Sequence, residues 1–345
     1  MKKYRLITLL LVSIVFVTAH PLGAADRTWD GGGANVNWST ITNWDGDATA
    51  PVANDVLFFG GSLGLINTND FTAGTQFNGI TFNSDAGAFV LRGNAINLGG
   101  DITNNSITTQ TISLNLALTA SRNFVVTTGG NLVLGGIVSG TTFGLNKDGA
   151  GTLTLSGANT FTGGATISAG TMVATVAGAL GNAGKVIVNN GTLNLTAGAV
   201  TYTGLDSGTL SGNGVVNVTL GTGANSTILN GNFAGFTGTW NIGIGAAAGA
   251  GKVAMTGLDN AGATVNVLAN GTLYVAAAVT KNAALVLNGG DTGESLGQLR
   301  LEGATWAGSV TLAGNITGGG DFTIGGNSMT LSDDVTITFE AETAK

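Results

Sequence analysis

Residues 146–174 read NKDGAGTLTLSGANTFTGGATISAGTMVA, and two features of this stretch decide the fold. Leu153 and Leu155 alternate with threonines, which is the period of a β-strand that buries one of its faces. The phrase Gly-Thr-Leu at Gly151 returns as Gly-Thr-Met at Gly170, nineteen residues later. Short strands that return at a fixed interval, with glycine at the corners between them, predict a chain wound into coils.

The repetition continues beyond this stretch. Gly-Thr-Leu begins again at Gly191, Gly208 and Gly271, so the first three intervals are 19, 21 and 17 residues, and the last, 63, is close to three periods. The same period-2 alternation recurs at Val186/Val188, Leu193/Leu195, Val216/Val218/Leu220, Val265/Val267, Leu273/Val275, Leu285/Leu287, Leu299/Leu301, Val310/Leu312 and Phe322/Ile324. Helical spacing is nearly absent after residue 25.

A sandwich or an up-and-down barrel would favour two-residue hairpin turns without a long fixed period. A period near 20 is instead typical of one rung of a solenoid. We therefore predict an all-β chain that forms a right-handed parallel β-helix, a β-solenoid, with an N-terminal cap rich in tryptophan. Coils stacked about 4.8 Å apart would give roughly 12–16 of them, in a rod on the order of 60–75 Å long.

Composition agrees with a folded, exported chain. Of 345 residues, 59 are Gly and 2 are Pro without a Gly-X-Y period, which excludes collagen. Charged residues make up 9 % and hydrophobic ones 43 %, the reverse of what disorder requires. We predict a signal peptide over residues 1–25, because a basic start at Lys2, Lys3 and Arg5 precedes an apolar run and a small-residue cleavage site.

The chain then divides into two further parts. Residues 26–60 are predicted to form the N-terminal cap, since they hold Trp29, Trp38, Trp44 and Pro51. Residues 61–345 are predicted to form the parallel β-helix, and no later segment is apolar enough to cross a bilayer. We see no linker that would divide it.

Charge and residue types limit the chemistry. The net charge is −7, or about −10 once the three basic residues of the leader are removed, which disfavours nucleic acid as a partner. Cysteine is absent, and His20, the single histidine, lies in the leader. The mature chain therefore lacks the usual general base, thiol nucleophile and best transition-metal ligands, and we expect no enzyme activity, cofactor or metal.

Residues 146–174 closely resemble the autotransporter-associated β-strand repeat, also called the passenger-associated transport repeat. Residues 109–114 (TQTISL) and 131–140 (NLVLGGIVSG) look typical of the same family, as does the opening with Trp29-Asp30-Gly31, Trp38, Asn43-Trp44 and residues 55–59 (DVLFF). Strong resemblance covers about a third of the chain.

The resemblance implies a parallel β-helix with a secreted or cell-surface role, and it carries no catalytic residues to transfer. Autotransporters end in a membrane β-barrel, whereas this chain ends at Ala344-Lys345 after no such strands, so we expect a fragment or release by another pathway. Our interpretation is a structural surface protein used in adhesion or in building an extracellular matrix, with surface glycans or neighbouring cells as partners.

Two alternatives remain open. A carbohydrate-active enzyme, a lyase or hydrolase on the same scaffold, would need acidic pairs, for which Asp45 with Asp47, Asp291 with Glu294, and Asp333 with Asp334 are the candidates. A glycan-binding module would stack sugar rings on Trp29, Trp38 and Trp44, although packing in the cap also explains these rings. Thr-X-Thr pairs, as at Thr152/Thr154, are scattered, and we interpret them as ordinary strand residues.

Overall fold

The computed structural model describes residues 24–345 apart from 183, 207, 222–225, 247–250, 258, 276–278, 290–297, 302–303, 314–315, 320–322, 325–328, 332–336 and 340–345. After residue 313 it describes the backbone only. The predicted signal peptide, residues 1–25, lies outside the described residues except for Ala24 and Ala25, as do Asp291, Glu294, Asp333 and Asp334.

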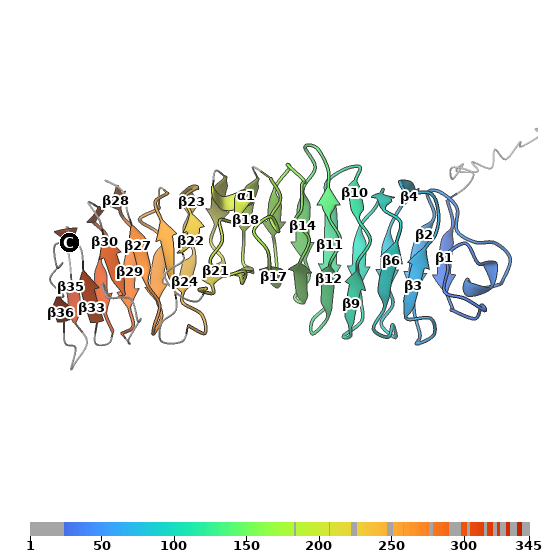
Figure 1. The fold of residues 1–345 in the computed structure, drawn as a ribbon, viewed down its shortest axis with the longest axis horizontal. Coiled ribbons are helices and arrows are strands. Elements are labelled where there is room, and N and C mark those ends of the chain that lie inside the picture. The colour runs from blue at the N-terminus through green and yellow to red at the C-terminus, as the bar shows by residue number, and fades with distance from the viewer. Residues whose placement is uncertain are drawn as a thin grey trace, which may run out of the picture.

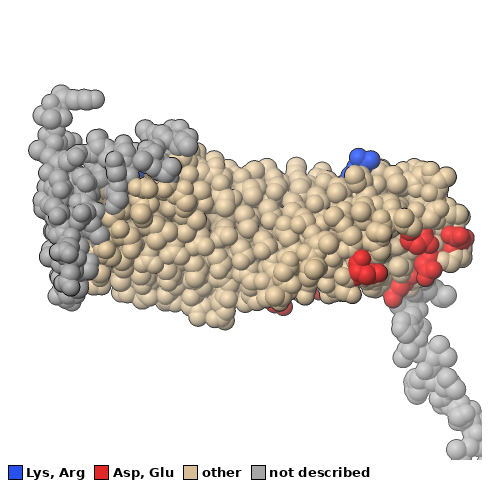
Figure 2. Space-filling view, turned by 90° about the horizontal axis from the view of Figure 1, so that it is seen from below, with Lys and Arg blue, Asp and Glu red and all other residues tan. Residues whose placement is uncertain are grey.

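The described chain winds into a straight rod of stacked coils (Figure 1). Each complete coil places one strand on each of three faces, and neighbouring coils are joined by parallel, in-register pairing, as between β12 and β15. In the space-filling view most of the visible face is uncharged, and Asp and Glu side chains gather toward the N-terminal end (Figure 2). The prediction of a β-solenoid is confirmed.

The strands of the first face form a ten-strand sheet that contains β1 (Asp26–Trp29), β2 (Val56–Phe59), β5 (Ile80–Phe82), β8 (Ile102–Asn104), β11 (Arg122–Val126), β14 (Leu145–Asp148), β16 (Ala165–Ile167), β18 (Lys185–Val188), β20 (Thr209–Gly212) and β23 (Asn232–Phe236). A smaller sheet follows further along the chain, with β28 (Thr280–Lys281), β31 (Thr305–Trp306) and β34 (Thr323–Ile324).

The second face is a thirteen-strand sheet, the longest in the rod. It contains β3 (Ile66–Asn69), β6 (Val90–Gly93), β9 (Thr109–Ile112), β12 (Asn131–Leu134), β15 (Thr152–Leu155), β17 (Thr171–Ala174), β19 (Thr192–Leu195), β21 (Val215–Val218), β24 (Thr239–Ile242), β26 (Thr264–Val267), β29 (Ala284–Leu287), β32 (Val310–Leu312) and β35 (Met329–Leu331). Its strand number falls within the predicted range of coils.

The third face is covered by two sheets. One contains β4 (Thr75–Phe77), β7 (Ile96–Leu98), β10 (Leu116–Leu118) and β13 (Val138–Ser139), and the other contains β22 (Ser226–Leu229), β25 (Lys252–Met255), β27 (Leu273–Val275), β30 (Leu299–Leu301), β33 (Ile316–Gly319) and β36 (Ile337–Phe339). Two short helices complete the described elements, the 3-10 helix η1 (Ile41–Asn43) and α1 (Thr203–Asp206).

Between β13 and β22 the third face is held partly by side chains. Asn159, which is buried, accepts a hydrogen bond from the Val138 backbone N–H at 2.8 Å and donates one to the Ala179 carbonyl at 2.7 Å. Its amide therefore ties together three successive coils where regular strands are missing. This explains why the repeat carries an asparagine between β15 and β16.

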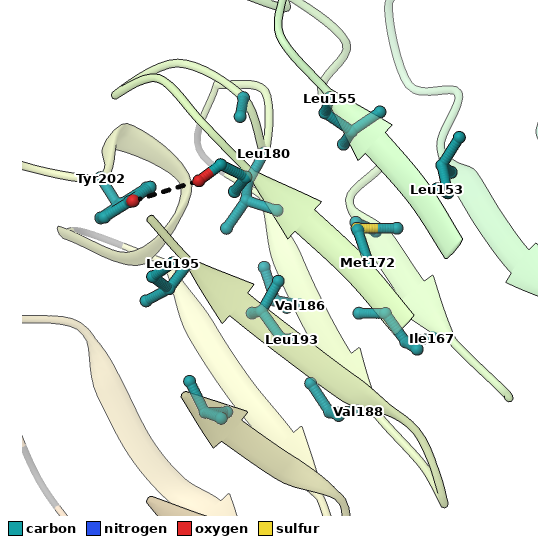
Figure 3. Close-up of a cluster of buried hydrophobic side chains, with 14 of the residues drawn as sticks. Leu153, Leu155, Ile167, Met172, Leu180, Val186, Val188, Leu193, Leu195 and Tyr202 are labelled. Atoms are coloured by element: carbon teal, nitrogen blue, oxygen red, sulfur yellow. Dashed lines mark hydrogen bonds between the residues drawn. The ribbon is translucent and has the colours of Figure 1, made fainter. Parts of the chain in front are cut away.

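Alternation sets which side chains form the core. In the thirteen-strand sheet the inward positions stack as one column, in which Leu132, Leu153, Met172 and Leu193 face each other in register and are buried. Figure 3 shows part of this column, with Leu153, Met172 and Leu193 pointing into the space between the sheets. Because successive side chains point to opposite faces, the intervening threonines lie outside.

Coil length varies more than the sequence phrase suggests. Paired residues lie 19 positions apart from Thr152 to Thr171 but 25 apart from Thr239 to Thr264. The Gly-Thr-Leu phrases at Gly208 and Gly271 do not continue the column of Gly151, Gly170 and Gly191, because they begin β20 and β27 on other faces. The phrase marks entry into a strand, not one fixed place on the coil.

Glycine is required at these entries by close packing between coils. A Cβ added at Gly151 would lie 2.2 Å from the Thr127 carbonyl oxygen of the preceding coil. Gly170 has a φ of +66°, in the left-handed region of backbone conformation that residues other than glycine rarely adopt. A glycine at the corner is therefore demanded both by space and by backbone conformation.

The segment predicted as a cap, residues 26–60, belongs to the same ladder as the rest. β2 pairs with β1 before it and with β5 after it, and Asn37 bridges to Thr68 at the end of the thirteen-strand sheet. The hydrogen bonding and the core therefore run from this segment into the β-helix without a break.

Substitutions on β19 test which side of the strand faces the core. Leu193→Ala should lower the free energy of unfolding by about 2–5 kcal/mol, because a fully buried side chain leaves a cavity. Thr192→Ala, one residue away on the outer face, should change it by less than about 0.5 kcal/mol. Chemical denaturation followed by circular dichroism measures both, and equal losses would show that the register is wrong.

Candidate functional site

The three tryptophans of the first coil lie inside the rod. Trp29, Trp38 and Trp44 are 1 %, 0 % and 1 % exposed, and the rings of Trp29 and Trp44 meet edge to face at 5.3 Å between centroids. Each indole N–H donates a hydrogen bond, to the Leu63 carbonyl, the Asn67 side chain and the Trp38 carbonyl respectively. A sugar-stacking platform needs an exposed ring face. The structure instead places in the core the three rings for which we considered glycan contact.

The acidic candidates that the structure describes lie in a turn. Asp45 and Asp47 are exposed on either side of Gly46, whose φ of +82° closes the turn after Trp44. Within the part of the chain that is described, no three acidic or histidine side chains come together in a group able to hold a metal ion. The pairs Asp291/Glu294 and Asp333/Asp334 fall outside that part.

One carboxylate near the N-terminus is buried and holds two coils together. Asp55 is 0 % exposed and forms an ion pair of 2.8 Å with Arg27 of β1. It also accepts hydrogen bonds from the backbone N–H groups of Ala25 and Val52. With all its partners in the protein, this side chain fixes the first coil rather than offering a site for chemistry.

Lys147 occupies an inward position inside the repeat that decides the fold. It follows Leu145 in the alternation of β14, pairs with Phe124 and Ile167, and is 0 % exposed. Its ammonium group donates to the carbonyls of Asp148 (2.8 Å), Gly149 (2.6 Å) and Ala169 (3.2 Å), so that it joins two successive corners. Burial lowers the pKa of Lys147 to about 8, an effect that the nearby Asp148 charge partly opposes.

A second buried lysine lies beside a small cavity in the core. Lys281 of β28 is 2 % exposed and donates to the Gly257 carbonyl, and the cavity is lined by aromatic rings that include Trp240 and Trp306. Burial lowers the pKa of Lys281, and Asp259 acts in the opposite direction. The Asp259 carboxylate is itself held by the backbone N–H groups of Asn282 and Ala283. These bonds replace strand pairing where the first face is interrupted between β23 and β28.

The outer surface of the thirteen-strand sheet is different in character. Its outward side chains form two columns of uncharged, mostly half-buried residues along nine successive strands. We call this the Thr/Asn face; its members are Thr109, Thr111, Asn131, Val133, Thr152, Thr154, Thr171, Val173, Thr192, Asn194, Val215, Asn217, Thr239, Asn241, Thr264, Asn266, Ala284 and Val286.

Four asparagines of this face form a ladder along the rod. The Asn217 amide donates to the Asn194 oxygen at 2.9 Å, Asn241 donates to Asn217 at 2.8 Å, and Asn266 donates to Asn241 at 3.0 Å. Asn217 and Asn241 each donate and accept one bond within the ladder, while Asn194 only accepts and Asn266 only donates. Since a primary amide has two N–H groups and two lone pairs on oxygen, further hydrogen-bonding capacity remains on the outside.

Neither the two buried lysines nor the asparagine ladder was predicted from the sequence. Lys147 stands two residues after Leu145, so the alternation that identified the strands already placed its side chain inside. The ladder was signalled by asparagine two residues after threonine, at Thr192/Asn194, Thr239/Asn241 and Thr264/Asn266. The Thr-X-Thr pairs are less scattered than they looked, because Thr109/Thr111 and Thr152/Thr154 share this face.

Comparison with known proteins supports the resemblance found in the sequence. The family model of the passenger-associated transport repeat matches residues 145–174, which hold β14 and β15 of one coil and β16 and β17 of the next. The chain therefore carries this repeat.

The chain is also similar to the adhesin BmaC autotransporter of Brucella suis biovar 1 (strain 1330), with 30 % identity over 219 residues. The match covers 57 % of this chain and 6 % of that protein's length. No solved structure matches the chain significantly. Among the described residues no helix is both long and apolar enough to span a membrane.

The buried ammonium predicts an unusual dependence of stability on pH. The pKa of Lys147 is about 8 in the folded chain and 10.5 as an ordinary value, so between these pH values the unfolded chain binds more protons and stability rises with pH. Relative to Lys147→Met, the wild type should gain about 3 kcal/mol between pH 8 and pH 10.5.

Denaturation at a series of pH values measures this difference. Lys185→Met removes an exposed lysine of β18, which lies two strands from β14 in the same sheet, and controls for the loss of one positive charge. A pH trend of the same size in both variants would contradict the assignment to Lys147.

Proposed function

We propose that this chain is a rod-forming segment of a cell-surface adhesin, exported through its leader at residues 1–25 and displayed outside the cell. The observation that carries the proposal is the passenger-associated transport repeat, whose strands belong to two successive coils of a continuous solenoid. The similarity to a protein named as an adhesin autotransporter points the same way. Because the chain spans only 6 % of that protein, its part in adhesion remains our proposal.

The physical properties of the rod suit this role. A single core of aliphatic and aromatic side chains runs through the described coils, and backbone ladders tie each coil to the next. Such an architecture holds a binding surface away from the cell on a stiff support. We propose that the rod binds surface glycans or neighbouring cells and does not act as a catalyst. Two observations support this: the inward side chains pack in the core, and the described acidic candidates Asp45 and Asp47 lie in a turn.

The test is adherence of the native cells. Deleting the gene should reduce adherence to a host-cell monolayer or to a matrix several-fold, and the full-length gene should restore it. Brief protease treatment of intact cells, followed by detection with an antibody to residues 26–313, should remove the chain if it is displayed outside. A chain that is protected in intact cells, or a deletion with unchanged adherence, would count against the proposal.

A further inference from the structure

We propose that the Thr/Asn face is a self-association surface, which binds the same face of a second copy of this chain. The proposal deepens the proposed function, on which it rests, by naming the partner of one surface. It depends on four features of this face: its lack of charge, its free amide groups, its axial spacing and its area.

Charge separates this face from the others. No charged side chain occupies its eighteen outward positions from β9 to β29, although the chain carries a net charge of −7. The first face carries Asp148 and Lys185 at outward positions, and the third carries Lys252 and Arg300. Like charges that meet across an interface are costly. Two copies therefore avoid charge repulsion at the contact when they meet through the Thr/Asn face.

Hydrogen-bonding capacity makes the face complementary to itself. Asn194, Asn217, Asn241 and Asn266 are fixed by their mutual hydrogen bonds, so their remaining N–H groups and lone pairs are held in one orientation. Threonine hydroxyls beside them both donate and accept. A surface that offers donors and acceptors in equal measure can bind a copy of itself, whereas a purely donating or accepting surface cannot.

The axial spacing of the strands allows two copies to meet in register. Strands in each copy repeat at about 4.8 Å along the rod, so a second copy has the same period without any adjustment. The strands of this sheet follow one another in a nearly straight row (Figure 1). A contact made at one coil is therefore available at the next, as in the dry interfaces between stacked sheets with asparagine ladders.

Area decides the expected strength. Nine strands about 4.8 Å apart and about 13 Å wide give a footprint of roughly 550 Å² per copy, or about 1,100 Å² for the pair. A specific interface needs about 1,000 Å², and obligate dimers bury about 2,000 Å² or more. We therefore expect a reversible, weak association with a dissociation constant on the order of micromolar, which many rods side by side on two cells would strengthen.

Charge reversal at the centre of the face tests the proposal. Thr192 lies on β19, the fifth of the nine strands, and its side chain faces outward. In a two-fold symmetric contact the central residue of one copy lies near the same residue of the other. Thr192→Lys and Thr192→Glu should each weaken self-association of the purified full chain at least tenfold in sedimentation equilibrium. An equimolar mixture of the two should recover association to within a few-fold of the wild type.

Matched variants on another face complete the design. Thr166→Lys and Thr166→Glu change the outward residue of β16 on the first face, and they should leave association unchanged. Recovery in the mixture shows that the Thr192 variants are folded, and thermal melting checks each separately. A wild type that stays monomeric at millimolar concentration would overturn the proposal, as would losses equal at Thr166 and Thr192 or a mixture that fails to recover.

A binding partner of the Thr/Asn face other than a second copy would give different results in these experiments. A monomeric wild type that is retained on insoluble cellulose or chitin, with retention lost in Thr192→Lys, would replace the second copy by a polysaccharide. Neither result depends on adherence of cells, so failure of self-association leaves the adhesin role standing. Conversely, association in the purified protein can hold even if deletion of the gene leaves adherence unchanged.

Discussion

The structure depends on one constraint, the in-register parallel stacking of strands whose side chains alternate between core and surface. A shift of one residue in any strand would turn its whole apolar set outward, so the apolar interior fixes the pairing of every coil. In the thirteen-strand sheet this constraint places Leu153, Met172 and Leu193 above one another in a single buried column. Corners must then be tight enough for coils to stack, which is why glycine stands at positions such as Gly151.

The sequence predicts the solenoid because its signal is local and repeated. Alternation of Leu153 and Leu155 with threonine identifies a strand, and its return after 19 residues identifies a coil. The local sequence of a strand does not predict the face on which it lies, because the face depends on the length of each intervening corner. This is why the phrases at Gly208 and Gly271 belong to other faces than the phrase at Gly191. Trp29, Trp38 and Trp44 are likewise compatible with core and surface until the first coil is closed around them.

The buried lysines show how far the stacking constraint overrides residue preference. An ammonium group inside a protein is costly unless its hydrogen bonds are satisfied. Lys147 meets this requirement with two backbone carbonyls at the corner that leads into β15 and one at the corner that leads into β17. Lys281 meets part of it with the Gly257 carbonyl. Both lysines therefore serve the joining of coils. Their lowered pKa values mark structural junctions here, although such values at other folds often mark active sites.

Outward side chains on the strands of a solenoid can vary, because the core side chains and the corner glycines determine how the coils stack. Exposed protein surfaces usually carry charged residues of both signs, which keep copies soluble and apart. The Thr/Asn face lacks them over nine strands, while acidic side chains gather toward the N-terminal end of the rod (Figure 2). A long uncharged face on a chain with excess negative charge leaves one direction in which two rods can approach. The core that makes the rod stiff also makes that approach cooperative, because every coil is already aligned when the first one touches.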